Sequence, residues 1–153
     1  MLSLFNQNTI IAGVGNPFRR DDGFGCEVIR LLRLENNHNF VLVDCGTDGL
    51  ALLDRISGYA QVVIIDAVRM RELSGVIKVF STTEAKVKIK SDVLSTHGLG
   101  LAEMLKLIEV LDIKANIKII GIQPKDIGFG EGFSDEVKNQ IPQVLNLIKQ
   151  IVL

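Results

Sequence analysis

Three side chains that could bind a metal or move a proton stand at points where apolar segments of the chain end. Asp22 follows a short apolar run, Asp66 comes directly after the four apolar residues 62–65, and His97 opens a later helical pattern. Two carboxylates and one imidazole would form a three-ligand site with open positions, which a catalytic or substrate-reading metal site requires. This mixed set suits a borderline transition metal better than magnesium or calcium, which prefer shells made only of oxygen.

Each of the three residues also has a simpler explanation. Asp22 and its neighbour Asp21 stand where a helix N-cap and a first-turn acid belong. Asp66 could cap a turn, although a carboxylate that follows four buried residues usually has a partner. His97 could be an exposed residue in the first turn of a helix. Because the three candidates are 44 and 31 positions apart, only the fold can bring them together.

Other residues offer less specific chemistry. Cys26 and Cys45 form no C-x-x-C pair, and the simplest interpretation is that both are small buried residues of a reduced, cytosolic protein. His38 stands among asparagines, which is typical of a surface turn. Asp44, at the end of another apolar run, could position a substrate or act as a base, or could equally cap the turn that follows it.

Strand and helix patterns alternate along the chain and would position these residues. The expected strands are 9–14, 40–44, 61–66, 75–80 and 116–123. Helices are expected after the turn at 21–22, from Thr47 to about 56, from His97 to about 111, and from Ser134 onward. Leu50, Leu53 and Ile56 would face inward from the second helix. The stretch 81–92 shows no regular pattern.

Alternating units of this kind predict an α/β fold with a mainly parallel sheet and helices on both faces. The link before strand 75–80 is too short for a parallel crossover, so this strand should run antiparallel to strand 61–66 if the two pair. We therefore expect a single domain over residues 1–153, a three-layer α/β/α sandwich with a mixed, mostly parallel five-stranded sheet. Ligands bind beyond the carboxyl ends of strands in such sheets, which is where Asp22 and Asp66 fall.

Composition and charge disfavour several classes of protein. Lys and Arg number 17 against 18 Asp and Glu, so no basic field would recruit nucleic acid or an anionic membrane. The N-terminus lacks the basic segment of a signal peptide, and the apolar runs are far shorter than the roughly 18 residues of a membrane helix. We expect a cytoplasmic protein with neither nucleic acid nor membrane as a partner.

Five short motifs, in order over nearly the whole chain, resemble those of the hydrogenase maturation proteases. They are GVGNPFRRDDGFG at 13–25, DCGT at 44–47, IDA at 65–67, STHGL at 95–99 and GIQP at 121–124 with the loop after it. The resemblance implies a phosphorylase/hydrolase-like α/β fold. It also implies an endopeptidase that removes the C-terminal extension of a nickel–iron hydrogenase large-subunit precursor after nickel insertion.

The same resemblance implies roles for particular residues. The family's metal-binding acids match Asp22, where some relatives carry Glu, and Asp66, and its histidine matches His97. The nickel would come with the substrate, so the isolated enzyme would not need to bind a metal tightly. Water would be activated by a metal or by a free carboxylate, for which Asp44 is a secondary candidate.

Two other functions stay open. A nickel-checking chaperone without proteolytic activity would have the same fold and ligands. A nucleotide-binding α/β domain is disfavoured, because Gly13 and Gly15 begin a G-x-G-x-x-G fingerprint whose third glycine position holds Phe18. The glycine-rich loop 121–132 could grip a substrate tail through its backbone or could be a flexible connector.

Overall fold

The five strands in the described part of the chain form one sheet in the order β2-β1-β3-β5-β4. The structure, a computed structural model, describes residues 8–35, 39–91, 94 and 101–152. Its strands are β1 (Thr9–Val14), β2 (Val41–Gly46), β3 (Gln61–Ala67), β4 (Ile77–Ser81) and β5 (Asn116–Ile122). β1 pairs in parallel with β2 and β3, and β3 pairs in parallel with β5. Only the edge pair β4–β5 is antiparallel among the described strands.

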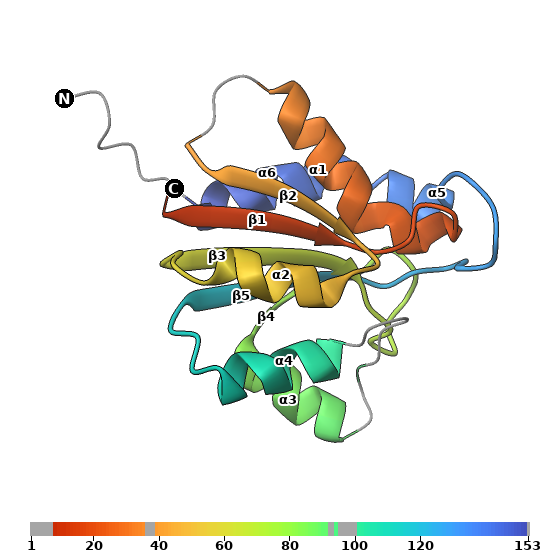
Figure 1. The fold of residues 1–153 in the computed structure, drawn as a ribbon. Coiled ribbons are helices and arrows are strands. Elements are labelled where there is room, and N and C mark those ends of the chain that lie inside the picture. The colour runs from red at the N-terminus through yellow and green to blue at the C-terminus, as the bar shows by residue number, and fades with distance from the viewer. Residues whose placement is uncertain (1–7, 36–38, 92–93, 95–100, 153) are drawn as a thin grey trace.

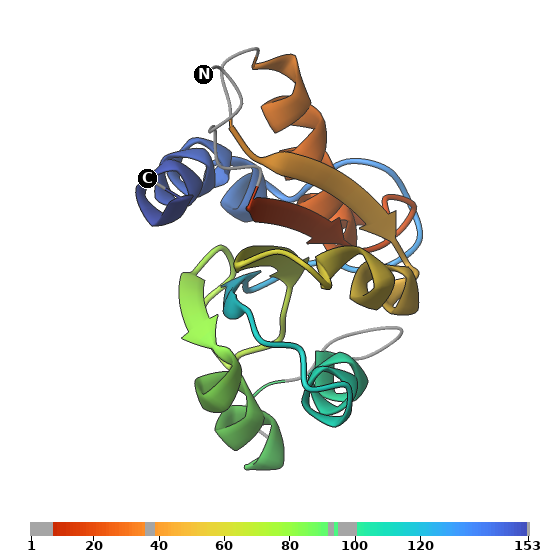
Figure 2. The same ribbon diagram turned by 60° about the vertical axis from the view of Figure 1, so that its left-hand side comes forward.

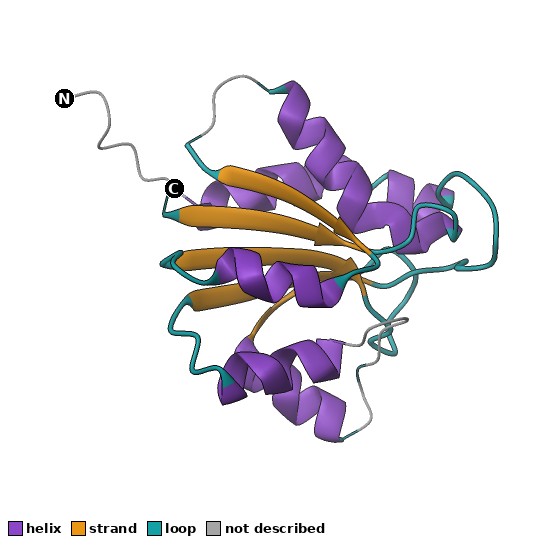
Figure 3. Cartoon of the chain, in the orientation of Figure 1, coloured by secondary structure: helices purple, strands orange, loops and turns teal. Residues whose placement is uncertain are grey.

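Helices cover both faces of the sheet (Figures 1 and 2). One face carries α1 (Phe24–Leu34), α5 (Asp135–Lys138) and α6 (Ile141–Val152), and the other carries α2 (Gly49–Ile56), α3 (Thr82–Lys90) and α4 (Leu101–Val110). The helices and strands are distinguished by colour in Figure 3. The predicted three-layer α/β/α sandwich with a mixed, mostly parallel sheet is therefore confirmed. Within the described residues, none of the helices is long and apolar enough to cross a membrane.

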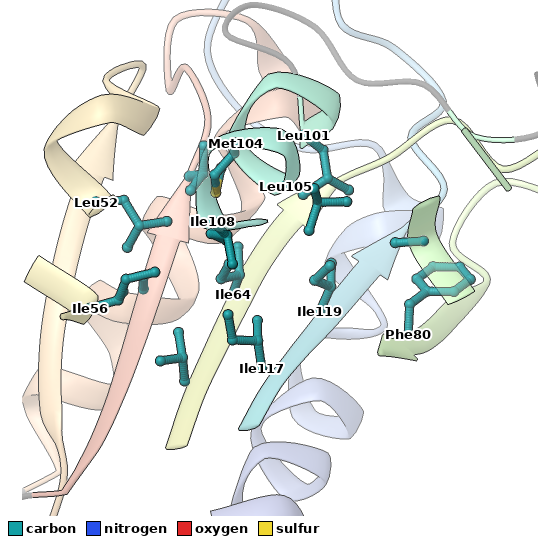
Figure 4. Close-up of a cluster of buried hydrophobic side chains, with 14 of the residues drawn as sticks. Leu52, Ile56, Ile64, Phe80, Leu101, Met104, Leu105, Ile108, Ile117 and Ile119 are labelled. Atoms are coloured by element: carbon teal, nitrogen blue, oxygen red, sulfur yellow. The ribbon is translucent and has the colours of Figure 1, made fainter. Parts of the chain in front are cut away.

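The central strands are buried on both faces, which explains their continuous apolar sequences. Every residue of β1 is buried, and so are six of the seven residues of β3. Alternate side chains point into two separate cores, with Ile64 on the face of α2 and α4 and Ile65 on the face of α1 and α6. Figure 4 shows the first of these cores, where Met104 and Ile108 of α4 pack over Ile64.

The antiparallel strand lies at the edge of the sheet. β4 pairs with β5, with Lys78 opposite Gly121 and Phe80 opposite Ile119, and not with β3. Because β5 is parallel to β3, β4 still runs opposite to β3, as its short connection predicts. The direction of the strand was thus predictable from the length of the link, whereas its partner was not.

A helix forms where the sequence pattern predicted irregular structure. α3 occupies Thr82–Lys90 within the stretch 81–92 and begins with a capping box, in which Ser81 and Glu84 bond reciprocally to each other's backbone N–H. Only Ala85 of this helix is buried, so its apolar pattern is too weak to predict a helix from periodicity. The irregular assignment was wrong because the cap, and not a buried face, marks this helix.

Helix ends differ from expectation at several points. α2 begins after Asp48, whose carboxylate accepts from the Ala51 N–H, so Asp48 and not Thr47 is its cap. Leu50 is exposed, and Leu52 points inward in its place. The C-terminal helix is divided into α5 and α6, and Ser134 precedes α5 without a side-chain cap bond.

Candidate active site

Three aspartates lie at the carboxyl edge of the sheet, where β1, β2 and β3 end. Asp66 is the penultimate residue of β3 and Asp44 lies near the end of β2. Gly13 of β1 pairs with Asp44 on one side and with Ile65 on the other, so these strand ends stand at one level. Asp22 follows β1 in a short 3₁₀ helix, η1 (Arg20–Gly23). At this edge, on the side of the strand arrowheads in Figure 1, the fold also places the loop after β5.

Glycines in the opening motif hold the Asp22 turn close to the strand ends. Gly15 has a φ of 144°, and a side chain there would collide with the Asp22 carbonyl oxygen. A side chain at Gly25 would collide with the backbone of Val14 and Ile65, so α1 packs directly on β1 and β3. The Asn16 N–H then donates to Asp22 Oδ2 at 3.0 Å. These close approaches place the Asp22 carboxylate beside the end of β3.

Asp22 and Asp66 are both buried, and each is only 6% exposed. Burial, followed by the negative charge of Asp22, raises the pKa of Asp66 well above its ordinary value, while a bond from the Ala67 N–H acts in the opposite direction. Two carboxylates in one dry site repel each other, and a cation bound between them would relieve both the burial and the repulsion. The described part of this site therefore favours a proton or a cation.

Cys26 lies where the three aspartates meet. Its thiol donates to the Gly15 carbonyl oxygen at 3.5 Å. Burial raises the pKa of Cys26, and so do a side-chain hydrogen bond with Asp44 and the negative charges of Asp44, Asp22 and Asp66. Cys26 is therefore a protonated, unreactive thiol, as expected of a small buried residue.

Asp44 differs from the other two aspartates because it is exposed. Its Oδ1 accepts from the Gly46 N–H at 2.9 Å, which is the turn-capping role considered from the sequence. Together with burial, its charge raises the pKa of the neighbouring Cys45 to about 11. The Asp44 side chain also makes a hydrogen bond with Cys26, and its role as a base stays a prediction.

Asp21 is a structural residue that the sequence marked only as an acid at a helix start. It is fully buried and accepts four hydrogen bonds from the loop after β5. The donors are the N–H groups of Lys125, Asp126 and Ser134 and the Ser134 hydroxyl, at 2.8 to 3.0 Å. Neither Asp21 nor Asp22 caps α1, whose N-cap is Gly23. The buried carboxylate instead fastens the loop to the turn that carries Asp22.

Further bonds hold the same loop. The Arg20 N–H donates to the Gly130 carbonyl oxygen at 3.2 Å, and the Gly130 N–H donates to Phe18 at 2.9 Å. Gln123 at its start accepts from the N–H groups of Met70 and Glu72 at 2.6 and 3.3 Å, which holds the segment after β3. The glycine-rich loop is thus fastened at both ends, so it is not a free connector.

His97, the third expected ligand, lies outside the described residues, as does His38. Among the residues that are described, no group of three or more His, Cys, Asp or Glu side chains is arranged to hold a metal ion. The fold brings Asp22 and Asp66 together, and Cys26 interacts with both of them and with Asp44. The assignment of His97 stays a prediction.

Comparison with known proteins identifies the family. The family model for hydrogenase maturation protease matches residues 26–151. The chain is 30% identical over 135 residues to protein FrxA of Pyrococcus furiosus, covering 86% of this chain and 96% of that protein.

Solved structures agree with this match. The NiFe hydrogenase maturation protease HybD from Thermococcus kodakarensis is 28% identical, with a TM-score of 0.76 over 94% of this chain and 97% of that one. The hydrogenase maturating endopeptidase HybD from Escherichia coli shares the fold with a TM-score of 0.78, at 22% identity over 92% and 88% of the two chains. The chain belongs to the hydrogenase maturation protease family, a family of endopeptidases, as its motifs predicted.

Proposed function

We propose that this protein removes the C-terminal extension from the large-subunit precursor of a nickel–iron hydrogenase after nickel has been inserted. Asp22, Asp66 and His97 bind the nickel of the precursor and so hold the scissile peptide at the carboxyl edge of the sheet. The reaction takes place in the cytoplasm.

One observation carries this proposal. Asp22 and Asp66 are buried side by side, and the charge of Asp22 raises the pKa of Asp66. Two neighbouring buried carboxylates favour a proton or a bound cation that offsets their charge, and perturbed groups of this kind cluster at functional sites. Carboxylates together with an imidazole suit nickel, and His97 would supply the imidazole.

The bound nickel recognises and orients the precursor, and hydrolysis then needs a polarised carbonyl and an activated water. Asp44 is the candidate for positioning or deprotonating that water, because it is exposed beside the buried carboxylates. Its hydrogen bond from the Gly46 N–H holds the carboxylate in place.

Intact-mass spectrometry of the precursor tests the proposal. Nickel-loaded and nickel-free precursor is incubated with the wild-type protein and with Asp22→Ala, Asp66→Ala, His97→Ala and Asp44→Asn. We expect one C-terminal mass loss that requires nickel and is abolished by the first three substitutions. We expect Asp44→Asn to slow cleavage about 10²-fold or more if Asp44 acts as the base.

A chaperone that checks for nickel without cleaving is the second candidate, because it would use the same buried carboxylates. It predicts a stable complex with the nickel-loaded precursor and no change in the mass of that precursor. This result, obtained with several nickel-loaded precursors, would replace the protease assignment.

A further inference from the structure

A small pocket lies on the face of the sheet that carries α3 and α4, at its β4 edge. Its volume is about 210 Å³. Met70, Phe80 and Leu94 form an apolar floor, and each is at most 4% exposed. Figure 4 shows the Phe80 ring on the same face as Ile119. We refer to this cavity as the Phe80 pocket.

The rim of the Phe80 pocket is basic. Arg71, Lys78 and Lys88 line it together with a single carboxylate, that of Glu72. Glu72 forms an ion pair with Lys78 at 2.5 Å. The Lys88 ammonium lies 5.7 Å from the centroid of the Phe80 ring and makes no ion pair within the part of the chain that is described. An occupant with an apolar group and a negative charge would complement both the floor and the rim.

The size of the pocket limits the apolar group. A cavity of about 150 Å³ admits benzene, whereas sites for cofactors and drug-sized ligands span roughly 300–1,000 Å³. The Phe80 pocket therefore accommodates one amino-acid side chain and excludes a nucleotide or other large cofactor.

Sheet register relates the Phe80 pocket to the candidate active site. Asp66 lies opposite Gly121, and Gly121 lies opposite Lys78, so Asp66 and Lys78 are two strands apart at one level of the sheet. With neighbouring strands about 4.8 Å apart, their backbones are separated by about 10 Å. An extended peptide covers that distance in about three residues. The segment Met70–Glu72 lies between Asp66 and Lys78 in the sequence. The Gln123 side chain holds this segment by accepting hydrogen bonds from the N–H groups of Met70 and Glu72.

We propose that the Phe80 pocket binds an apolar side chain of the precursor polypeptide that is accompanied by a carboxylate and lies about three residues from the scissile bond. The apolar side chain contacts Met70, Phe80 and Leu94, and the carboxylate binds the Lys88 ammonium. This inference rests on the proposed function for the identity of the occupant, and it adds a specificity site that the metal-binding residues do not supply.

Binding of a minimal probe tests the Phe80 pocket without any cleavage. N-acetyl-leucine carries an apolar side chain and a carboxylate, and N-acetyl-leucinamide lacks the charge. Each is titrated into the full ¹⁵N-labelled protein while amide chemical shifts are followed by NMR. We expect N-acetyl-leucine to shift the amides of Arg71, Lys78 and Lys88, and to bind about threefold to tenfold more tightly than the amide.

Two substitutions on the same helix control the measurement. Lys88→Gln should remove the preference for the acid over the amide, whereas Lys90→Gln, on α3 but outside the pocket, should preserve it. The proposal would be overturned if the two probes bound equally tightly, or if chemical shifts changed only at residues outside the pocket. It would also be overturned if Lys88→Gln and Lys90→Gln lost the preference for the acid to the same extent.

Cleavage kinetics then separate this inference from the proposed function. Lys88→Glu should raise the KM for the precursor about threefold to tenfold and leave kcat within about twofold, because the group contributes to binding and not to the chemical step. Lys90→Glu should leave both unchanged. If the probe binds and no precursor is cut, the protease assignment is wrong and the proposed binding site is still supported. If the precursor is cut, but the probe does not bind and Lys88→Glu leaves KM unchanged, then only the proposal for the Phe80 pocket is wrong.

Discussion

Among individual residues, Asp66 illustrates how burial and a neighbouring negative charge raise the pKa of a carboxyl group. Its position after the apolar residues 62–65 is visible in the sequence, but its protonation depends on Asp22, 44 positions earlier. A folded-state pKa above that of the unfolded chain means that Asp66 favours folding at low pH. This contribution is lost as the pH rises through the folded-state pKa, so Asp66 favours folding less near neutral pH than at low pH.

Replacing this carboxylate should therefore stabilise the protein while it abolishes function. We expect Asp66→Asn, in the presence of EDTA, to raise the urea midpoint of unfolding at about pH 7. The difference from the wild type should shrink as the pH falls towards the ordinary aspartate pKa of about 3.9, because the raised pKa favours the protonated carboxyl in the folded state. The exposed residue Asp54 gives the control, since Asp54→Asn should change little at either pH. A lower midpoint for Asp66→Asn at neutral pH would contradict the assigned direction of the pKa shift.

The residues of the candidate site were only partly accessible from sequence. Asp22, Asp44 and Asp66 were selected because they follow apolar runs, and the fold gathers all three at one edge of the sheet. Asp21 was indistinguishable from a helix-start acid, because its partners are more than 100 positions away. Gln123 was noticed only as part of a motif, and its bonds to the segment after β3 became visible in three dimensions.

At the scale of elements, Asp21 joins η1 to the loop that follows β5. Replacing it by alanine removes the acceptor for four donors in a buried place. We expect Asp21→Ala to lower the free energy of unfolding by about 3 kcal/mol or more, measured by urea unfolding, because each unsatisfied buried donor costs about 1–3 kcal/mol.

Hydrogen exchange would locate this effect. The amides of Lys125, Asp126 and Ser134 should lose protection in Asp21→Ala, while those of β3 should keep it relative to global stability. Asp54→Ala, at an exposed position of α2, should stay within about 0.5 kcal/mol of the wild type. Wild-type stability in Asp21→Ala would show that the loop is held by other contacts.

Element types were well predicted where a buried face imposes a period. β1 was predicted at its observed bounds and β3 to within one residue, because both are buried on two faces. α3 was missed because it buries only Ala85, and the bounds of α2 shifted because Asp48 provides the cap. Capping hydrogen bonds decide where these helices begin, and in the sequence several neighbouring polar residues could have formed such a bond.

For the whole molecule, the candidate metal site joins segments that are distant in sequence. Asp22, Asp66 and His97 can act together only in the folded chain, so nickel should bind the folded state in preference to the unfolded state. Ni²⁺ at about ten times its Kd should therefore raise the free energy of unfolding by about 1.4 kcal/mol.

Thermal unfolding with and without Ni²⁺ measures this linkage. The increase in Tm should disappear in Asp66→Asn, and Mg²⁺ at the same concentration should have little effect because the ligand set includes an imidazole. Equal stabilisation of the wild type and Asp66→Asn would place the nickel elsewhere on the protein.

The sequence by itself determined the alternation of strands and helices, the layered α/β architecture, and the motifs that place the protein in its family. These properties depend on periodicity and on residues close together in the chain. The tertiary structure decided that β4 pairs with β5, that Asp21 binds the loop after β5, and that Asp22 perturbs Asp66. It also decided that a basic pocket lies two strands from Asp66. These features depend on which distant segments become neighbours and on how much water they exclude, and no local pattern encodes either quantity.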